Sequence, residues 1–311
     1  MKKKAMKIIG IALTACLAMA MMAACGNKAP EPASTPTMAQ TPTSAPAAPA
    51  PAPAETGLSG EVITAGSTSV QPLSQELADA FMDMYSGVIV DVQGGGSGQG
   101  VKAVEEDLVD FGALSRELKD EEKPLASGGE FIIAKDGIAI VVNKDVDVDD
   151  LSKDQLKGIF TGEITDWSAV GGAAGKIVVV AREEGSGTRD AFNELTGVLG
   201  KDADGNNVDN TVETALIQGS TGAVVTTVSN TESSIGYISL GSLNDSVNAV
   251  KVEGVAPSTS AVLNGTYIIS RPFIYITGRS PLSEAAQAFI DFVMSPEGQT
   301  IVEESGFIAV A

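Results

Sequence analysis

The chain has 311 residues, 40 of them acidic and 20 basic, with a formal net charge of −20 at pH 7. This charge argues against nucleic-acid binding, because affinity for a phosphate backbone depends on clustered Lys and Arg. The chain contains no histidine, which removes the commonest general base and the commonest zinc ligand. Composition therefore favours a binding protein over an enzyme.

The first 24 residues are typical of a secretory signal peptide. Four lysines lie within the first seven residues, and an apolar run from 8 to 24 follows them. This run is short for a transmembrane helix, which needs about 20 apolar residues and stop-transfer flanks. Residues 22–25, Met-Ala-Ala-Cys, resemble the lipobox of bacterial lipoproteins, whose cysteine is lipidated and becomes the new N-terminus. We therefore predict lipidation at Cys25.

Two alternatives for this segment stay open. Cys16 follows Leu-Thr-Ala, which matches the usual lipobox more closely, but cleavage there leaves an apolar core of only about eight residues. The other alternative is a plain secreted protein with an incidental cysteine.

Residues 25–57 predict a disordered tether. They are rich in Ala, Pro, Thr and Ser and include eight prolines. Such a stretch buries too little apolar surface to offset its ordering entropy, and its prolines keep it extended. A lipid followed by a spacer indicates a folded domain held away from a membrane.

The body, residues 58–311, alternates apolar β-rich runs with helical periodicity, which is typical of α/β layers. It contains no cysteine, so it forms no disulfide. Within it, one pattern occurs three times: a strand, a loop of Gly with Ser or Thr, and a helix. The three copies lie at residues 62–84, 88–108 and 177–195.

These loops carry the candidate ligand groups. Thr68 and Ser69 stand at the start of the first helix, Ser97 lies in the glycine-rich second loop, and Arg182 opens the third. Hydroxyls and free amides at a helix N-terminus bind anions, and a guanidinium grips an oxyanion through two parallel hydrogen bonds. A single such loop is more often only a helix cap. Three of them predict a buried tetrahedral oxyanion, without choosing between phosphate, sulfate and molybdate.

Other motifs lack the context that their chemistry needs. Asp110-Phe111-Gly112 spells a kinase signature, but no Gly-rich loop with a strand lysine and no catalytic loop accompanies it. The acidic residues 145–150 lack the EF-hand spacing and predict a solvated turn before a helix at residues 151–160. We therefore predict no metal ion and no cofactor.

Seven motifs resemble the phosphate-binding protein of the phosphate-specific ABC importer, the PstS family, and they occur in that family's order over nearly the whole body. They are residues 65–68 (Ala-Gly-Ser-Thr), 93–97 (Gln-Gly-Gly-Gly-Ser), 109–113 (Val-Asp-Phe-Gly-Ala), 159–167 (Ile-Phe-Thr-Gly-Glu-Ile-Thr-Asp-Trp), 182–188 (Arg-Glu-Glu-Gly-Ser-Gly-Thr), 234–237 (Ser-Ile-Gly-Tyr) and 271–275 (Arg-Pro-Phe-Ile-Tyr).

The resemblance implies an α/β, two-lobed periplasmic-binding-protein fold of type II, with a ligand cleft between the lobes and two hinge crossovers. The first crossover falls near residues 130–137 and the return near 265–276. We therefore expect lobe 1 to combine residues 58–135 with 275–311, and lobe 2 to comprise residues 136–274. A monomer is the family expectation.

The resemblance also implies the residues that hold phosphate. Carried over by motif, the donors are Thr68, Ser69, Ser97, Arg182, Ser186, Gly187 and Thr188. Glu184 is expected to fix the guanidinium of Arg182. In the best-known form of the family an aspartate follows the 109–113 strand and accepts the proton of phosphate. Here Ser115 and Arg116 follow instead, and both join the expected site. We therefore do not expect an aspartate to accept a hydrogen bond from protonated phosphate.

The implied function is that of an extracytoplasmic lipoprotein on the outer face of the cell membrane. It captures inorganic phosphate and hands it to the permease of an ABC importer, and it is not an enzyme. The alternatives are a receptor for sulfate or molybdate, a phosphate sensor outside transport, and a surface scaffold whose glycine loops are only helix caps.

Overall fold

The computed structural model describes residues 57–310. The predicted signal peptide, both candidate lipidation sites (Cys16 and Cys25) and all but the end of the predicted tether lie outside the described residues. Between residues 57 and 310, no helix is both long enough and apolar enough to cross a membrane.

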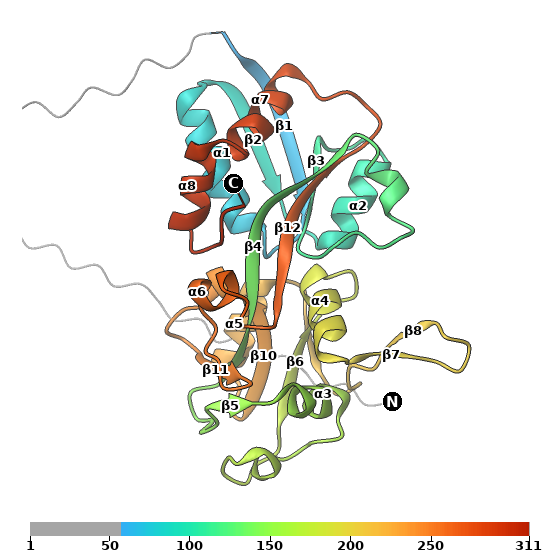
Figure 1. The fold of residues 1–311 in the computed structure, drawn as a ribbon, viewed down its shortest axis with the longest axis vertical. Helices are drawn as coiled ribbons and strands as arrows, with labels where there is room; N and C mark the ends of the chain where they lie inside the picture. The colour runs from blue at the N-terminus through green and yellow to red at the C-terminus, as the bar shows by residue number, and fades with distance from the viewer. Residues whose placement is uncertain (1–56, 311) are drawn as a thin grey trace, which may run out of the picture. The chain divides into compact units, whose positions relative to one another are not determined.

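The first lobe is built from two separate stretches of chain (Figure 1). Its elements are β1 (Ser59–Gly66), α1 (Gln71–Met84), β2 (Gly87–Gln93), α2 (Ser97–Glu105), β3 (Phe111–Leu114), the 3-10 turn η1 (Lys123–Leu125), the first part of β4 (Gly129–Val142), β12 (Ser270–Thr277), α7 (Glu284–Val293) and α8 (Pro296–Glu304).

The second lobe is continuous in sequence (Figure 1). Its elements are the rest of β4, β5 (Asp150–Leu151), α3 (Lys153–Thr161), η2 (Trp167–Val170), β6 (Val178–Arg182), α4 (Gly187–Thr196), β7 (Leu199–Lys201), β8 (Asn207–Asp209), β9 (Leu216–Gln218), α5 (Thr221–Asn230), β10 (Ser234–Ser239), η3 (Leu240–Ser242), β11 (Asn248–Val252) and α6 (Thr259–Leu263).

The strands form one hydrogen-bonded path in the order β2-β1-β3-β12-β4-β10-β6-β9, with β11 beside β4 and β5. In the first lobe β1 pairs in parallel with β2 and β3, and in the second β6 pairs in parallel with β9 and β10. Parallel strands joined by helices bring the carboxyl ends of strands and the N-termini of helices to one edge of a sheet, where α/β proteins bind ligands.

Two strands cross between the lobes. β4 is 14 residues long, and its part up to Gly137 pairs with β12 while the part from Ile138 on pairs with β10. We expected the first lobe to resume at residue 275. Phe273 already packs in the first lobe's core, whereas Ile269 packs in the second lobe's core. The return crossing therefore lies near Ser270, because the chain enters the first lobe as soon as β12 pairs with β4.

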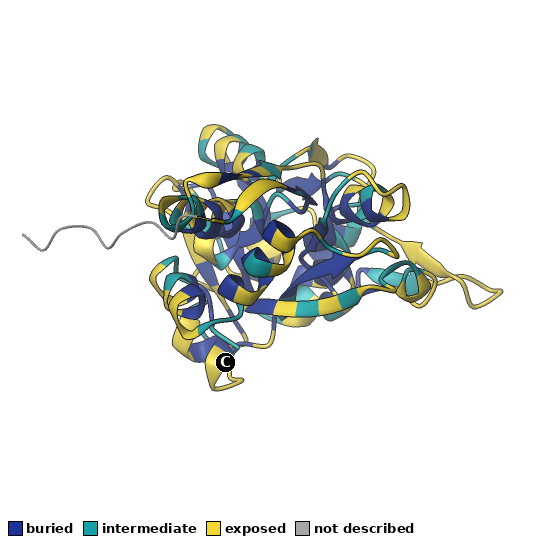
Figure 2. Cartoon of the chain, turned by 90° about the horizontal axis from the view of Figure 1, so that it is seen from above, coloured by how far each residue is buried: buried dark blue, intermediate teal, exposed yellow. Residues whose placement is uncertain are grey.

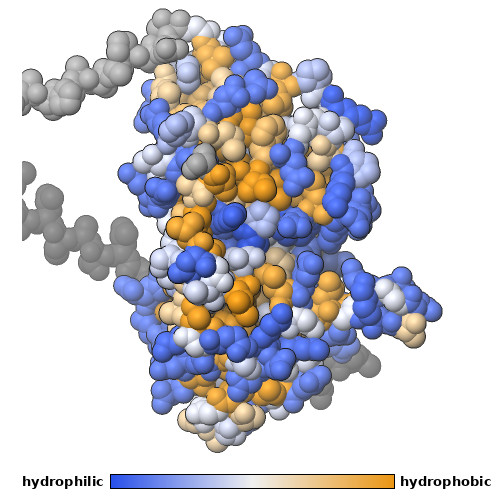
Figure 3. Space-filling view, viewed as in Figure 1, coloured by the Kyte–Doolittle hydropathy of each residue, from blue (hydrophilic) through white to orange (hydrophobic). Residues whose placement is uncertain are grey.

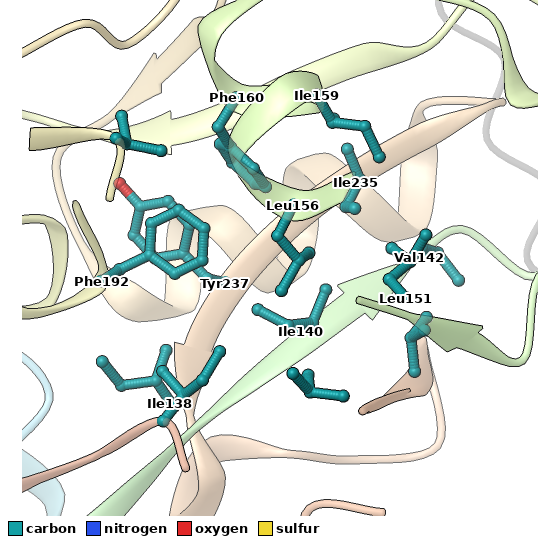
Figure 4. Packing of buried hydrophobic residues seen from close by; sticks show 14 of the residues in the cluster. Ile138, Ile140, Val142, Leu151, Leu156, Ile159, Phe160, Phe192, Ile235 and Tyr237 are labelled. Carbon is teal, nitrogen blue, oxygen red and sulfur yellow. The ribbon is translucent and has the colours of Figure 1, made fainter. Parts of the chain in front are cut away.

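Each lobe has its own hydrophobic core. In the first lobe, the rings of Phe81 (α1) and Phe289 (α7) meet with centroids 5.3 Å apart. In the second, Phe192 (α4) stacks on Tyr237 (β10) at 4.2 Å, and Phe160 (α3) packs against both rings (Figure 4). Buried residues line the strands and the inner faces of the helices, and exposed residues lie outside (Figure 2). Further clusters lie in the second lobe around Val141 and Val224 and in the first around Val101 and Ile274. Each lobe is therefore packed about its own hydrophobic clusters, and β4 and β12 connect the two.

Local sequence explains where the helices begin. α1 carries Pro72 in its first turn, and its apolar residues Leu73, Leu77 and Phe81 recur every four positions on the buried face. α3 begins at Lys153 rather than at the expected residue 151. The reason is that Ser152 and Gln155 form a capping box, while the two residues before Ser152 form β5.

A hairpin of β7 and β8 projects from the second lobe (Figures 1 and 2). Its surface is mostly hydrophilic (Figure 3), and its connecting turn is held by Asp202, which accepts bonds from the backbone amides of Asp204 and Asn206.

Candidate functional site

The three predicted loops lie at the edge where the two lobes meet. β1, β2 and β6 each end just before the loop that opens α1, α2 or α4. A fourth loop, after β9, opens α5 in the same way. The starts of these four helices bring hydroxyl groups from both lobes into one buried cluster, which we call the hydroxyl cluster. Its described members are Ser67, Ser69, Ser97, Ser115, Thr188 and Thr221.

The first lobe contributes four serines that bond to one another. The Ser67 hydroxyl donates to the Ser115 hydroxyl at 2.8 Å, and the Ser115 amide donates to the Ser97 hydroxyl at 3.1 Å. The Ser69 amide donates to the Ser67 hydroxyl at 3.2 Å. All four side chains are buried. Three chain segments far apart in sequence thus share one polar patch.

The Ser69 hydroxyl also reaches across to the second lobe. It lies 2.7 Å from the Thr188 hydroxyl at the start of α4 and 2.8 Å from the Thr221 hydroxyl at the start of α5. Both threonines are buried. Because a hydroxyl has one donor and two acceptor positions, these bonds can turn without any movement of the backbone.

Arg182, at the end of β6, is the cation of the cluster and is 1% exposed. Its Nη1 donates to the Thr221 hydroxyl at 3.0 Å, and its Nη2 donates to the Thr68 hydroxyl of the first lobe at 3.0 Å. The Arg182 amide donates to the hydroxyl of Tyr237, and burial raises the pKa of that phenol above its ordinary range. The strand end that carries the arginine is therefore held by the core of its own lobe.

Glu183, and not the expected Glu184, holds the guanidinium. Its two carboxylate oxygens accept from Nε and Nη2 of Arg182, both at 2.7 Å. Glu184 is exposed. The difference follows from the turn after β6, in which the Ser186 amide donates to the Glu183 carbonyl and leaves Glu184 at the outer corner.

Arg116 also differs from the expectation. Its Nη1 and Nη2 donate to the two carboxylate oxygens of Glu122 at 2.6 and 2.8 Å, and its Nε lies 2.9 Å from Oδ2 of Asp190. A carboxylate matches the planar guanidinium in two-point geometry. The charge of Arg116 is therefore directed to acidic side chains, whereas its neighbour Ser115 joins the hydroxyl cluster.

The lobes touch most closely at glycines. The Gly98 amide donates to the Gly185 carbonyl of the other lobe at 3.0 Å. A Cβ added at Gly187 would overlap the Ser97 hydroxyl and lie 2.8 Å from that of Ser115. Glycine is needed at Gly187 because any side chain there would hold the two lobes apart.

Ser186 stands at the N-cap of α4, where its hydroxyl accepts from the Arg189 amide at 3.3 Å. Its expected role as a ligand donor stays a prediction. Within residues 57–310 there is no group of three or more Cys, Asp or Glu side chains arranged to hold a metal ion.

Sequence reasoning missed two members of the hydroxyl cluster. Ser67 belongs to the motif at residues 65–68, but of that motif only Thr68 was predicted as a donor. Thr221 follows a short strand and the run Gly219-Ser220. This is the same order of strand, small polar loop and helix as in the other three loops, so the signal was present.

Comparisons with known proteins identify the family. A profile described as the PBP superfamily domain matches residues 50–297. The chain is similar to the phosphate-binding protein PstS of Bacillus subtilis, with 32% identity over 94% of this chain and 90% of that protein. The chain belongs to the PstS family of phosphate-binding proteins. The family and the two-lobed α/β fold predicted from the motifs are thus confirmed.

Two further proteins match this chain, one over part of its length and one in structure. PstS 2 of Streptococcus agalactiae serotype V is 44% identical over 49% of this chain, and the match spans about half (51%) of that relative. A structure from Clostridium perfringens, a putative phosphate ABC transporter substrate-binding protein with bound phosphate, superposes with a TM-score of 0.75. It has 41% identity to this chain, and the match covers 81% of this chain and 100% of that one.

Proposed function

We propose that this PstS-family protein captures inorganic phosphate between its lobes and is the substrate-binding component of a phosphate ABC importer. The observation that carries the proposal is the buried hydroxyl cluster around Arg182, to which both lobes and four helix starts contribute. The names of the relatives, and the bound phosphate of the Clostridium perfringens structure, support phosphate as the ligand.

The physical chemistry of the cluster fits a tetrahedral anion. Hydroxyls that now bond to one another, such as Ser69 with Thr188, can turn to donate to phosphate oxygens. The N-termini of α1, α2, α4 and α5 add about half a positive charge each. A site of this kind binds an anion inside a strongly acidic protein, because local donors outweigh surface charge that solvent screens.

In this proposal Arg182 supplies, among residues 57–310, the full positive charge that touches the anion. Glu183 holds the guanidinium by two hydrogen bonds, which fixes its plane and leaves Nη1 directed at the cluster. A guanidinium fixed in advance loses less side-chain freedom on binding, so more of its attraction appears as affinity.

Sulfate is the main competing ligand, because the side chain at position 115 does not exclude it. At position 115 a hydroxyl stands where the best-known form of the family carries a carboxylate. A carboxylate repels fully ionised sulfate, whereas the Ser115 hydroxyl can either accept from hydrogen phosphate or donate to sulfate. The alternative function is therefore a receptor for tetrahedral oxyanions in general.

We also propose the location. The motif at residues 22–25 favours lipidation at Cys25, and the proline-rich stretch that follows favours a body held away from the outer face of the cell membrane. A monomer is what the family resemblance implies. In this proposal the protein acts as a receptor and carries out no chemical reaction on phosphate.

The test is titration calorimetry of the protein, freed of bound ions, with phosphate and then sulfate. Arg182→Ala is expected to weaken phosphate binding by at least about 2 kcal/mol, roughly thirtyfold, because a buried charged pair with the ligand is lost. Arg279→Ala removes an exposed arginine and serves as the control, with unchanged affinity expected.

Each outcome has a distinct meaning. Tight one-to-one binding of phosphate without a response to sulfate supports the proposal. Equal responses support the general oxyanion receptor, and no response to either anion favours the scaffold. Wild-type affinity in Arg182→Ala would refute the assigned site.

A further inference from the structure

Four charged side chains join the two lobes beside the hydroxyl cluster. The first lobe provides Arg116, Lys119 and Glu122, and α4 of the second lobe provides Asp190. Oδ2 of Asp190 lies 2.9 Å from Nε of Arg116 and 3.0 Å from Nζ of Lys119. We call these four residues the cross-lobe latch.

The latch is attached directly to residues of the proposed phosphate site. Arg116 follows Ser115 in the chain, and Asp190 is two residues after Thr188. Opening of the cleft would separate both contacts of Asp190. It would leave the pair of Arg116 with Glu122 intact, because both of these residues belong to the first lobe. Glu122 therefore holds the guanidinium in position, and Asp190 is the partner that opening removes.

Burial makes the contact between Arg116 and Asp190 stronger than an ordinary surface pair. The side chains of Arg116 and Asp190 are 5% and 27% exposed. Nε of Arg116 and Oδ2 of Asp190 are both shielded from solvent, and neither makes a hydrogen bond of regular geometry within the described residues. The two atoms thus stabilise each other by Coulomb attraction, which is less screened in these surroundings than in water.

We propose that Arg116 and Asp190 are positioning residues that hold the lobes closed over bound phosphate and set the rate of its release. The inference rests on the proposed function. It reassigns Arg116 from direct contact with the anion to a contact across the cleft. Lys119 is 46% exposed, so its contribution is smaller.

Phosphate release from the full-length protein is the quantity to measure. The protein is loaded with labelled phosphate, and the loss of label is followed after addition of excess unlabelled phosphate. Asp190→Asn keeps the shape of the side chain and removes its charge. We expect release to become about tenfold faster, while association changes by less than about threefold, because truncation of a shielded charge pair acts mainly on dissociation.

Asp120→Asn is the matched control. Asp120 lies in the same first-lobe segment and pairs with Lys123 of its own lobe, and its side chain is 94% exposed. The Asp120→Asn variant should release phosphate at the wild-type rate. Asp190→Glu restores the charge and should recover part of the slow release, which a purely structural role for the residue's shape would not produce.

Arg116→Gln distinguishes the latch from direct contact with the anion. If the latch is correct, Arg116→Gln in the Asp190→Asn background releases phosphate no faster than Asp190→Asn alone. A further large loss of affinity in the double variant would return Arg116 to the anion and overturn the latch. Wild-type release in Asp190→Asn, in a protein that binds phosphate, would refute the latch alone. A wild-type protein that binds no phosphate would overturn the proposed function together with the latch.

Discussion

The two strands that cross between the lobes carry a buried ion pair whose loss should destabilise the whole body. Asp136 of β4 and Arg271 of β12 are register partners, and they are 1% and 4% exposed. Nη2 of Arg271 donates to Oδ2 of Asp136 at 3.0 Å, and Oδ1 accepts from the Leu240 amide at 3.2 Å. Burial raises the pKa of the Asp136 carboxyl even beside the guanidinium.

Removal of one partner leaves the other charge buried without compensation. For pairs of this kind the loss is about 3–5 kcal/mol of unfolding free energy. Asp136→Asn is expected near about 3 kcal/mol, at the lower end of that range, since its amide oxygen can still accept one hydrogen bond from Arg271. The double variant Asp136→Leu with Arg271→Met removes both charges and should be more stable than Arg271→Met alone, because no uncompensated carboxylate remains.

The assay is urea unfolding near neutral pH, with equal slopes required before midpoints are compared. Asp120→Asn, which breaks the exposed pair with Lys123, is the control and should change the midpoint little. If Asp136→Asn shifts the midpoint no more than this control, burial of the pair does not carry the energy assigned to it.

Three further predictions concern the site, the latch and the anchor. Thr221→Val should weaken phosphate binding about tenfold in calorimetry, because Arg182 loses a charged hydrogen bond worth about 1.5 kcal/mol. Unchanged affinity would contradict its place in the site. Burial alone would raise the pKa of Glu122, but hydrogen bonds from Arg116 hold it below its ordinary 4.5. At pH values just below 4.5 the unfolded state therefore binds more protons at Glu122 than the folded state does, so the free energy of unfolding should fall as the pH drops below about 4.5. Glu122→Gln should make this fall less steep in urea unfolding. Cys25→Ser should release the protein from membranes in a fractionation experiment, and retention would favour Cys16 or an uncleaved signal.

Much of the fold was predictable because its signals are local. The pattern of a strand, a loop of small polar residues and a helix places Thr68, Ser97 and Thr188 at helix starts. Parallel pairing then brings such starts to one edge of each half of the sheet. The exact return of the chain was less predictable, since Phe273 and Ile269 are both apolar residues near the crossing. Only three-dimensional packing assigns them to different cores.

The roles of adjacent residues in the site could not be predicted from the sequence. A motif states which residue types stand in a loop, but it does not state which of two adjacent side chains faces the ligand. Glu183 and Glu184 are chemically equal, and the turn at Ser186 alone decides that the first one holds Arg182.

Ser115 and Arg116 make the same point with a larger consequence. The serine bonds into the hydroxyl cluster, while the arginine turns to Glu122 nearby and to Asp190, which is distant in sequence and lies in the other lobe. An arginine beside an anion site looks like a ligand until its carboxylate partners are located in space. Glu183 pairs with Arg182 in the same way, but Arg182 also donates to Thr68 and Thr221 at the cluster. The described contacts of Arg116 go to Glu117, Glu122 and Asp190 instead. In the proposed site the attraction for phosphate therefore comes from Arg182 and the helix starts, and Arg116 acts across the cleft.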